Sequence, residues 1–270
     1  MSEFVSSKYN FIRPFKTDDL TRLGRDADGG YILDKKIILE SKYLISFGLG
    51  DDWSFELDLI ARNKNIEIHV YDHTINTSIY LSKIFKYARR FLTFRSDFNS
   101  IYSRIKEYLN YKSFINHKNV SFFREKVSSP ANYNYESDIK KIFSRIDLNK
   151  NIILKCDIEG SEYEIIDDLM KVSSSINIIL IEFHNIGEKD ELFTQSITKL
   201  KEKFNIIHLH GNNHANILTS GLPEILEMTL LNKSFEIDTS EQINSFPIKD
   251  LDFPNNPYVK DLFFSFKKSS

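Results

Sequence analysis

Four carboxylates surround one glycine in the segment ILKCDIEGSEYEII, which begins at residue 153. Asp157 and Glu159 come directly after the apolar run IILKC, whereas Glu162 and Glu164 fall in the first turns of a predicted helix. Acidic residues near a helix N-terminus interact favourably with the helix dipole, so Glu162 and Glu164 have an ordinary structural explanation. Asp157 and Glu159 have none, and we expect them to face a ligand or a reacting group.

A glycine-containing loop, SFGLGDDW, offers a second candidate site. Gly48 and Gly50 allow a tight turn and a close approach of the backbone to a ligand, and a helix that begins near Trp53 would supply free amide groups. Asp52 stands where a dinucleotide fingerprint has its third glycine, which argues against a pyrophosphate. Asp51 and Asp52 suit ribose hydroxyls or a cationic group; alternatively, one of them caps the helix.

An acidic residue also follows the next apolar run, in the segment VYDHT. Asp72 lies about twenty residues beyond the glycines, where many nucleotide-binding α/β proteins place the acceptor for ribose hydroxyls. We therefore predict that Asp72 binds the ribose of a nucleotide-like ligand, with His73 beside it in the same site. The alternative is a solvated aspartate in the turn that begins the following helix.

These candidate residues need a scaffold, and the apolar pattern predicts one. Short β-rich runs separated by stretches with helical spacing indicate alternating strands and helices. The strand runs are KYLISF (42–47), IEIHVY (66–71), VSFFR (120–124), IILKC (152–156), NIILIEF (177–183) and NIIHLH (205–210). Apolar stripes within 139–146 and 192–204 fit helices between them. Such alternation is typical of a doubly wound α/β sheet of parallel strands.

A seventh strand, EILEMTLLN (224–232), follows the sixth through a loop without helical spacing, so we expect an antiparallel return. Ligands of such sheets bind at the carboxyl ends of the strands, where the candidate residues lie. No composition shift marks a domain boundary. We expect one domain over residues 1–270, with an N-terminal cover segment (1–41) and a C-terminal extension (236–270).

Composition narrows the class of protein further. The 270 residues carry 36 basic and 38 acidic side chains, a net charge of −2, which gives no overall nucleic-acid footprint. The single cysteine, Cys156, excludes an intrachain disulfide framework and fits a reducing cytoplasm. The N-terminus lacks a signal-peptide layout, and no stretch is long and apolar enough for a membrane span. We therefore expect a cytoplasmic protein without stable membrane insertion.

The segment LKCDIEGSEYEII resembles the K-x-D-(I/V)-E-G-(A/S)-E signature of the FkbM-type S-adenosylmethionine-dependent methyltransferases. Further segments are similar in kind and order to those of a bacterial branch of that family: GRDADGGYIL, SFGLGDDWSFELDLI, IEFHNIG, HLHGNN and GLPEILEMTLL. The resemblance covers roughly residues 20–235. It implies a Rossmann-like methyltransferase fold: a seven-stranded, mostly parallel sheet with an antiparallel seventh strand and helices on both faces.

The resemblance also implies S-adenosyl-L-methionine as the cofactor and a hydroxyl of a sugar or glycan as the acceptor, with surface polysaccharide synthesis as a setting. Methyltransferases usually carry an acidic residue two places before the first glycine of the cofactor loop, and this chain has Ser46 there. Asp51, Asp52 or Asp157 would then hold the methionine amino group.

Transfer of a methyl group to a hydroxyl is helped by a general base at the carboxyl edge of the sheet. His184 directly follows the fifth strand run, and its imidazole titrates near neutral pH, so we predict that His184 is the base. Asp157, Glu159 and His210 are the alternatives.

Two segments are predicted to bind the acceptor. Arg25, Asp28 and Tyr31 flank a glycine pair in GRDADGGYIL, which forms either a plain hairpin or, as the resemblance implies, a cover over the pocket. His210 and Asn212 lie in HLHGNN, after the sixth strand run. We expect a sugar or glycan as the partner and no nucleic acid, and the sequence indicates no oligomeric state.

The candidate residues also include potential ligands for a divalent metal ion. Imidazole and carboxylate groups suit such an ion, and its ligands would be His208, His210 and His214 together with Asp157, but we do not favour a metal-dependent reaction. Two other functions stay open: a methyltransferase-like binding module without turnover, and a nucleotide-sugar or NAD enzyme on a similar sheet.

Overall fold

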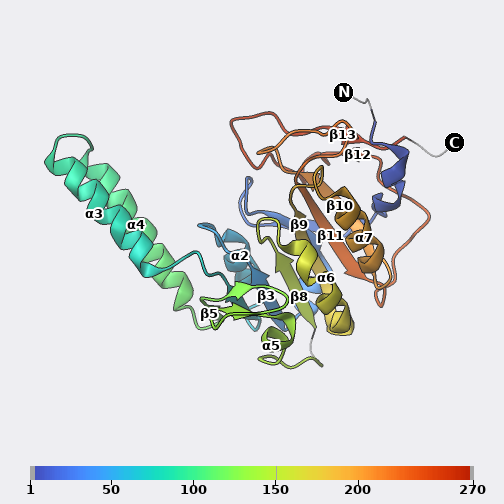
Figure 1. Cartoon of the computed structure of the whole chain (residues 1–270), viewed down its shortest axis with the longest axis horizontal. Helices are drawn as coiled ribbons and strands as arrows, with labels where there is room; N and C mark the ends of the chain where they lie inside the picture. The colour runs from blue at the N-terminus through green and yellow to red at the C-terminus, as the bar shows by residue number, and fades with distance from the viewer. Residues whose placement is uncertain (1–3, 150, 268–270) are drawn as a thin grey trace.

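The seven apolar runs that the sequence predicts as strands form one sheet. The computed structural model describes residues 4–149 and 151–267, and the sheet lies at its centre (Figure 1). Its strands are, in chain order, β3 (Tyr43–Phe47), β4 (Glu67–Tyr71), β5 (Val120–Phe123), β8 (Ile152–Cys156), β9 (Ile176–Phe183), β10 (Phe204–Gly211) and β11 (Leu226–Asn232). Each overlaps its predicted run, because apolar residues dominate these strands, and all of them except the edge strand β5 contain buried residues.

The strand order and directions confirm the predicted Rossmann-like methyltransferase fold. The order across the sheet is β10-β11-β9-β8-β3-β4-β5. Strands β3, β4, β5, β8 and β9 run parallel, and β11, the seventh strand along the chain, is antiparallel to both of its neighbours. All parallel strands therefore present their carboxyl ends at one edge, which is where ligands bind in sheets of this kind.

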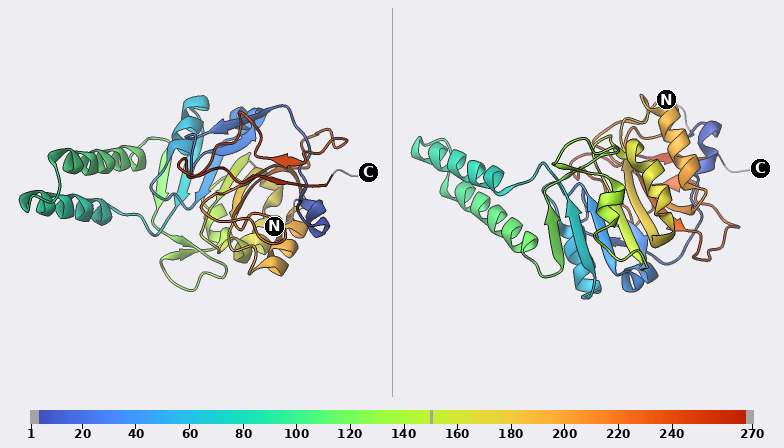
Figure 2. Two further views of the ribbon diagram at one scale, coloured as in Figure 1. Left: turned by 90° about the horizontal axis from the view of Figure 1, so that it is seen from above. Right: turned by 60° about the horizontal axis from the view of Figure 1, so that its bottom comes forward.

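Helices cover both faces of the sheet, as predicted (Figures 1 and 2). One apolar layer joins the strands to α5 (Ile139–Phe143), α6 (Glu162–Lys171) and α7 (Asp190–Leu200). The opposite layer joins them to α1 (Lys35–Glu40), α2 (Ser54–Arg62) and a hairpin of β1 (Leu20–Leu23) and β2 (Tyr31–Asp34). Neighbouring strand residues contribute to opposite layers because side chains alternate along a strand.

Two helices are shorter than their predicted apolar stripes. Helix α5 ends at Phe143, so Ile146 packs against the core from the following turn. Helix α7 ends at Leu200, and Phe204 begins β10 instead of closing the helix. Apolar spacing locates the buried face of a helix but not the residue at which the helix ends.

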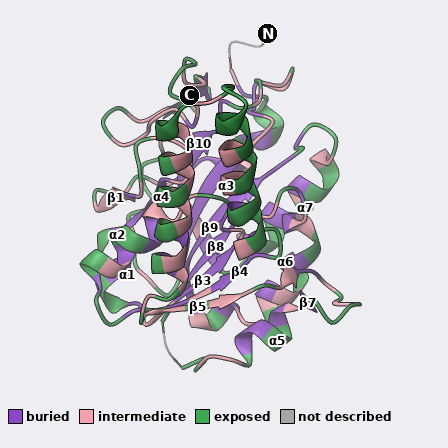
Figure 3. Ribbon diagram, turned by 90° about the vertical axis from the view of Figure 1, so that its left-hand side faces the viewer, coloured by how far each residue is buried: buried purple, intermediate pink, exposed green. Residues whose placement is uncertain are grey.

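A helical hairpin between the second and third strands of the sheet was not predicted. Helices α3 (Thr77–Leu92) and α4 (Phe98–Ile115) lie side by side and project from the body (Figures 1 and 2). Their outer faces are exposed, while the sheet behind them is buried (Figure 3). Helical spacing indicates that a segment is helical, but it does not say whether the helix returns to the sheet.

The two ends of the chain pack beside each other along the β10 edge. The amide of Val5 donates to the Ser265 carbonyl at 2.8 Å, and the amide of Phe15 donates to the Ile206 carbonyl at 2.9 Å. The predicted C-terminal extension contributes β12 (Ser245–Phe246) and β13 (Phe264–Ser265), and residues 1–3 and 268–270 of the two predicted end segments lie outside the described residues. The remaining short elements are η1 (Ser7–Ile12), β6 (Lys126–Val127), β7 (Glu136–Ser137) and η2 (Ser173–Ser175). Among the described residues no helix is long and apolar enough to cross a membrane.

Candidate functional site

A cavity of about 350 Å³ opens at the carboxyl edge of the sheet. Its walls come from the loops after β3, β4, β5 and β8 and from the β1–β2 hairpin, within residues 25–31, 48–52, 71–74, 125–127 and 155–161. Seven acidic side chains and three basic ones are among the lining residues. The size is typical of a small-molecule site, and the acidic lining favours a neutral or cationic ligand over a phosphate.

The two glycines of the β3 loop serve different purposes. Gly48 has φ +73°, and a Cβ atom there would lie 1.7 Å from the carbonyl oxygen of Asp157. Glycine therefore lets the β3 loop pack directly against the tip of β8. Gly50 has φ +62°, but a Cβ atom there would meet no atom within 4 Å. Gly50 thus presents bare backbone to the cavity, as predicted for a cofactor loop.

Asp72 is bound to the glycine loop by its own hydrogen bonds. Its Oδ2 accepts from the amides of Leu49 at 2.9 Å and Gly50 at 3.1 Å, and its Oδ1 accepts from the amide and the hydroxyl of Thr74 at 2.7 and 2.6 Å. These four bonds use the acceptor sites of one carboxylate. Asp72 therefore fixes the loop, and ribose binding by Asp72, which stays a prediction, would need one of these bonds to be exchanged. His73 lines the cavity beside it.

The two aspartates after Gly50 have different surroundings. Asp52 accepts from the amide and the hydroxyl of Ser54 at 3.1 and 3.0 Å and pairs with Arg25 at 3.0 Å. It therefore holds the start of α2, although the N-cap residue is Trp53 and not one of the two aspartates. Asp51 is exposed and lines the cavity. Of the two, Asp51 is the better placed to meet a cationic group of the ligand.

A buried charge pair borders the cavity, and neither partner was assigned a role from the sequence. Lys155 of β8 and Glu56 of α2 are 3.4 Å apart, and the hydroxyl of Ser46 donates to Glu56 at 2.9 Å. Burial alone would lower the pKa of Lys155, but the charges of Glu56 and Asp157 outweigh burial and raise it. Lys155 is therefore a fixed cation below Asp157. Glu56 is buried and paired, so it does not supply the carboxylate that Ser46 lacks for a methionine amino group.

The three residues predicted as catalytic meet at the end of β8 and β9. His184 Nε2 lies 3.9 Å from Asp157 Oδ1 and 3.5 Å from Glu159 Oε2. It also lies 3.5 Å from Glu182 Oε1, a buried carboxylate in β9 that sequence reasoning missed. Glu159 has φ +54°, a left-handed conformation that is rare outside glycine and is found at functional turns.

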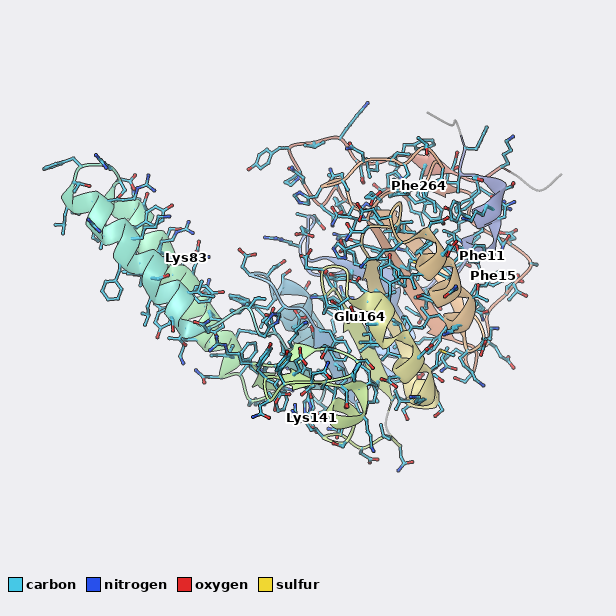
Figure 4. The ribbon with its side chains drawn as sticks, viewed as in Figure 1. Phe11, Phe15, Lys83, Lys141, Glu164 and Phe264 are labelled. Carbon is cyan, nitrogen blue, oxygen red and sulfur yellow. The ribbon has the colours of Figure 1, made fainter. Side chains whose placement is uncertain are left out.

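Glu162 is part of this site, contrary to its prediction as an ordinary first-turn acid. It is fully buried, and its Oε1 accepts from the amides of Ile158 at 3.1 Å and Gly160 at 3.0 Å. The same oxygen lies 3.0 Å from His184 Nδ1. Glu162 thus ties the turn that carries Asp157 and Glu159 to the imidazole. Glu164 is exposed on α6, as the dipole explanation requires (Figure 4).

Burial and neighbouring charges shift the pKa values of Asp157, Glu182 and His184. Burial raises the pKa of Asp157 to about 6, although Lys155 and His184 oppose the shift. Burial also raises the pKa of Glu182 well above its usual range, and the neighbouring Asp157 carboxylate adds to the shift. Burial would lower the pKa of His184, but hydrogen bonding to Glu162 and the surrounding carboxylates outweigh it and raise the pKa.

The raised pKa of His184 favours the protonated imidazole, whereas the pKa of Asp157, about 6, leaves that carboxylate mostly ionised at neutral pH. A protonated imidazole cannot accept a proton, so this shift disfavours His184 as the general base, a role that stays a prediction. Asp157 remains 28 % exposed at the cavity wall and accepts a hydrogen bond from the Tyr31 hydroxyl at 3.1 Å. Asp157 is therefore the better candidate for the base.

The group of Asp157, Glu182 and His184 could also hold a divalent metal ion. One potential ligand atom from each lies within 4.8 Å of the others. Imidazole and carboxylate oxygens suit such ions, and an imidazole whose other nitrogen is held by a carboxylate is common among metal ligands. This differs from the predicted ligand set of His208, His210 and His214 with Asp157, which the structure does not bring together.

The histidines of β10 are engaged elsewhere. His208 lies 2.9 Å from Asp252, and His210 lies 3.2 Å from both Glu227 and Asp261. Burial would lower the pKa of His210, but its bonds to Asp261 and Glu227 raise it to about 10. His210 is buried and does not line the cavity, so the prediction that it binds the acceptor, or acts as the base, is wrong for this structure.

Only one of the two segments predicted to bind the acceptor lines the cavity. Asn212 is also buried away from the cavity, where its amide donates to Glu182 at 2.9 Å and orients that carboxylate. Arg25, Asp28 and Tyr31 all line the cavity. The β1–β2 segment is thus both a hairpin and a cover, and the Thr229 hydroxyl anchors it by donating to the Ile32 carbonyl at 2.6 Å.

Comparison with known proteins gives remote structural similarity only. No protein-family model matches the sequence, and no curated protein matches it. Among solved structures, the chain is similar to a fibrillarin pre-rRNA processing protein of Methanococcus jannaschii, with 9% identity over 73% of this chain and 68% of that chain and a TM-score of 0.37. It is similar to a precorrin-6y C5,15-methyltransferase of Geobacter metallireducens, with 11% identity over 72% and 82% and a TM-score of 0.35. It is also similar to the 23S rRNA methyltransferase ErmE, with 10% identity over 75% and 69% and a TM-score of 0.39. These values carry no inference about ligand or substrate.

Proposed function

We propose that this protein transfers a methyl group from S-adenosyl-L-methionine to a hydroxyl group. The observation that carries the proposal is the cavity at the carboxyl edge, where a glycine loop with bare backbone meets an aspartate whose pKa is raised to about 6. The donor is already activated as a sulfonium, so catalysis consists mainly of aligning the acceptor and removing its proton. Both tasks fit the residues present.

In this proposal the cofactor lies against the β3 loop. The backbone at Gly50 and the side chains of Asp72 and His73 contact the nucleoside end of the cofactor. Asp51 faces its cationic methionine end. The acidic lining favours a ligand with a sulfonium and an ammonium group and no phosphate. The same charge disfavours one of the two alternatives, a nucleotide-sugar or NAD enzyme, since NAD and nucleotide sugars both carry a pyrophosphate.

Asp157 accepts the proton of the acceptor hydroxyl. The Tyr31 hydroxyl and the Lys155 cation orient and partly neutralise this carboxylate, while protonated His184 stays bound to Glu162 and keeps the turn in place. Glu159, beside His184 at the rim, would accept a hydrogen bond from a second hydroxyl of the acceptor. A divalent ion is not needed for these steps.

The acceptor class rests on the resemblance to the FkbM-type enzymes and on the character of the cavity. Arg25, Asp28 and Glu159 offer the donors and acceptors that a polyhydroxylated sugar or glycan requires, and no nucleic-acid acceptor is proposed because its phosphates would face seven acidic side chains. We also place the activity in the cytoplasm, where a buried free thiol such as Cys156 stays reduced.

A two-step experiment tests the proposal. Calorimetric titration with S-adenosylhomocysteine should show saturable binding, and a methyl-donor assay against sugars, glycans and nucleotide sugars should then identify the acceptor. Binding without transfer to any hydroxyl acceptor would favour the binding module. Binding of NAD or a nucleotide sugar instead of S-adenosylhomocysteine would replace the proposal with the other alternative.

A further inference from the structure

The α3–α4 hairpin lacks a core of its own. From residue 81 to residue 110 no residue is buried, although the two helices contact each other. Helix α3, with its 16 residues, is about 24 Å long, so most of the hairpin lies beyond the body of the protein (Figure 1). Helices of this length depend on an apolar face packed against something else. The hairpin therefore offers an exposed surface on which another molecule or a membrane could bind.

Each helix carries an exposed apolar stripe. On α4 the stripe consists of Phe98, Tyr102, Ile105 and Leu109, which follow one another at spacings of three and four residues. On α3 the exposed apolar residues Leu81, Phe85 and Leu92 lie on one face by the same rule. These residues do not serve the contact between the two helices alone, because their side chains remain exposed.

The tip of the hairpin is the most apolar point of this surface. Phe94, in the turn between the helices, is 99 % exposed, and Leu92 and Phe98 on either side are 78 % and 65 % exposed. An exposed apolar turn of this kind can enter a soft apolar layer.

The charge of the hairpin indicates which kind of partner it binds. Residues 77–115 carry eight Lys and Arg residues and two acidic residues, a net charge of +6 in a chain whose net charge is −2. A shallow hollow near the tip is lined by Lys86, Arg89, Arg90 and Arg95 together with Phe85 and Thr93. Within residues 4–149 and 151–267 none of these four cations forms an ion pair with a carboxylate. Lys83, another of the basic residues, also lies on the hairpin (Figure 4).

We propose that the α3–α4 hairpin docks onto an anionic lipid bilayer, with Phe94 and its apolar neighbours entering the interface and the basic residues contacting lipid phosphates. Helices with basic residues and exposed Phe and Leu bind such interfaces without spanning them. Anionic headgroups attract each nearby Lys or Arg. A second copy of the hairpin is disfavoured because two segments of charge +6 repel each other. A nucleic acid is disfavoured because it leaves the leucine and phenylalanine tip without an apolar environment.

The geometry leaves the cavity free in this docked state. The hairpin emerges between β4 and β5 and extends away from the sheet (Figure 2). Contact at the tip therefore holds the body above the bilayer rather than against it. The proposal does not depend on methyl transfer and can be tested without it.

The test is flotation of the full chain with lipid vesicles. We expect binding to vesicles that contain phosphatidylserine and phosphatidylcholine, no binding to pure phosphatidylcholine, and loss of binding as salt is raised. Substitution of Phe94→Ser, or of Lys86→Glu together with Arg89→Glu, should weaken binding by at least about tenfold, since each basic residue near an anionic surface adds to the affinity. These side chains are exposed, so the variants should fold, which unchanged circular dichroism would verify.

Matched controls lie outside the hairpin. Phe263→Ser removes an aromatic residue that is 68 % exposed, and Lys249→Glu reverses an exposed charge; both variants should bind as the wild type does. The proposal is overturned if the wild type does not float with anionic vesicles, or if the controls lose as much binding as the hairpin variants. It is also overturned if Phe94→Ser converts a dimer into a monomer, or if a single-stranded RNA binds the hairpin and vesicles do not.

Discussion

The charge of Glu162 should hold the Asp157 turn and His184 together, and Glu162→Gln removes that charge while keeping the shape of the side chain. The carboxylate oxygen accepts two backbone bonds and faces the imidazole at 3.0 Å, all in a fully buried position. Hydrogen bonds to a charged group contribute about 1.5–3 kcal/mol and neutral ones about 0.5–1.5 kcal/mol. With three such contacts weakened, we expect the free energy of unfolding to fall by about 2–4 kcal/mol.

The loss should depend on pH in a defined direction. The folded-state pKa of His184 is raised, in part by Glu162, so the charged imidazole stabilises the fold below the unfolded-state pKa of about 6.5, and this contribution is lost as pH rises through the folded-state pKa. Urea unfolding of wild type and Glu162→Gln should therefore differ more at pH 6 than at pH 9.

The matched control is Glu164→Gln, two residues away on the same helix. Glu164 is exposed, so its substitution should cost only a few tenths of a kcal/mol (about 0.3) through the helix dipole, with activity nearly intact. If Glu162→Gln behaves like Glu164→Gln, or if its stability loss is independent of pH, the role assigned to Glu162 is refuted.

Three further outcomes are expected. If Asp157 is the base, the rate of transfer should rise with pH through about 6 and then level off, because only the ionised carboxylate accepts a proton. Asp157→Asn should reduce the rate at least tenfold, equivalent to about 1.4 kcal/mol. A rate independent of pH between about 5 and about 7, one unit on either side of the midpoint, would contradict this. Turnover should persist in excess EDTA; its disappearance, with recovery on adding Mg²⁺ or Mn²⁺, would make Asp157 a metal ligand instead of the base. Gly48→Ala should destabilise the protein by about 4 kcal/mol or more because of the 1.7 Å contact, and Gly50→Ala by only about 1–2 kcal/mol because its cost is the left-handed backbone; equal melting temperatures for the two variants would argue against the packing of the β3 loop on β8.

The sequence predicts the sheet well because its central strands are buried on both faces and read as continuous apolar runs. It also places Asp157, Glu159 and His184 at one edge, since the carboxyl ends of parallel strands meet there. Two charged residues within those apolar runs, Lys155 and Glu182, were signals that could have been used. A charge inside a buried strand needs a partner, and both residues lie at the site.

Other features could not be obtained from spacing. Glu162 and Glu164 are indistinguishable as first-turn acids until the fold shows that one is buried against His184 and the other is exposed. The pairing of His210 with Asp261 joins residues 51 positions apart. The α3–α4 hairpin projects away from the sheet because most of its residues do not pack against the body of the protein. No local sequence pattern encodes this arrangement.

Calorimetric titration of the full chain with S-adenosylhomocysteine asks whether the cavity at the carboxyl edge binds S-adenosyl-L-methionine. We expect saturable one-to-one binding, with no comparable binding of NAD or a nucleotide sugar under the same conditions. Absence of binding at millimolar S-adenosylhomocysteine, or tighter binding of a pyrophosphate ligand, would contradict this expectation.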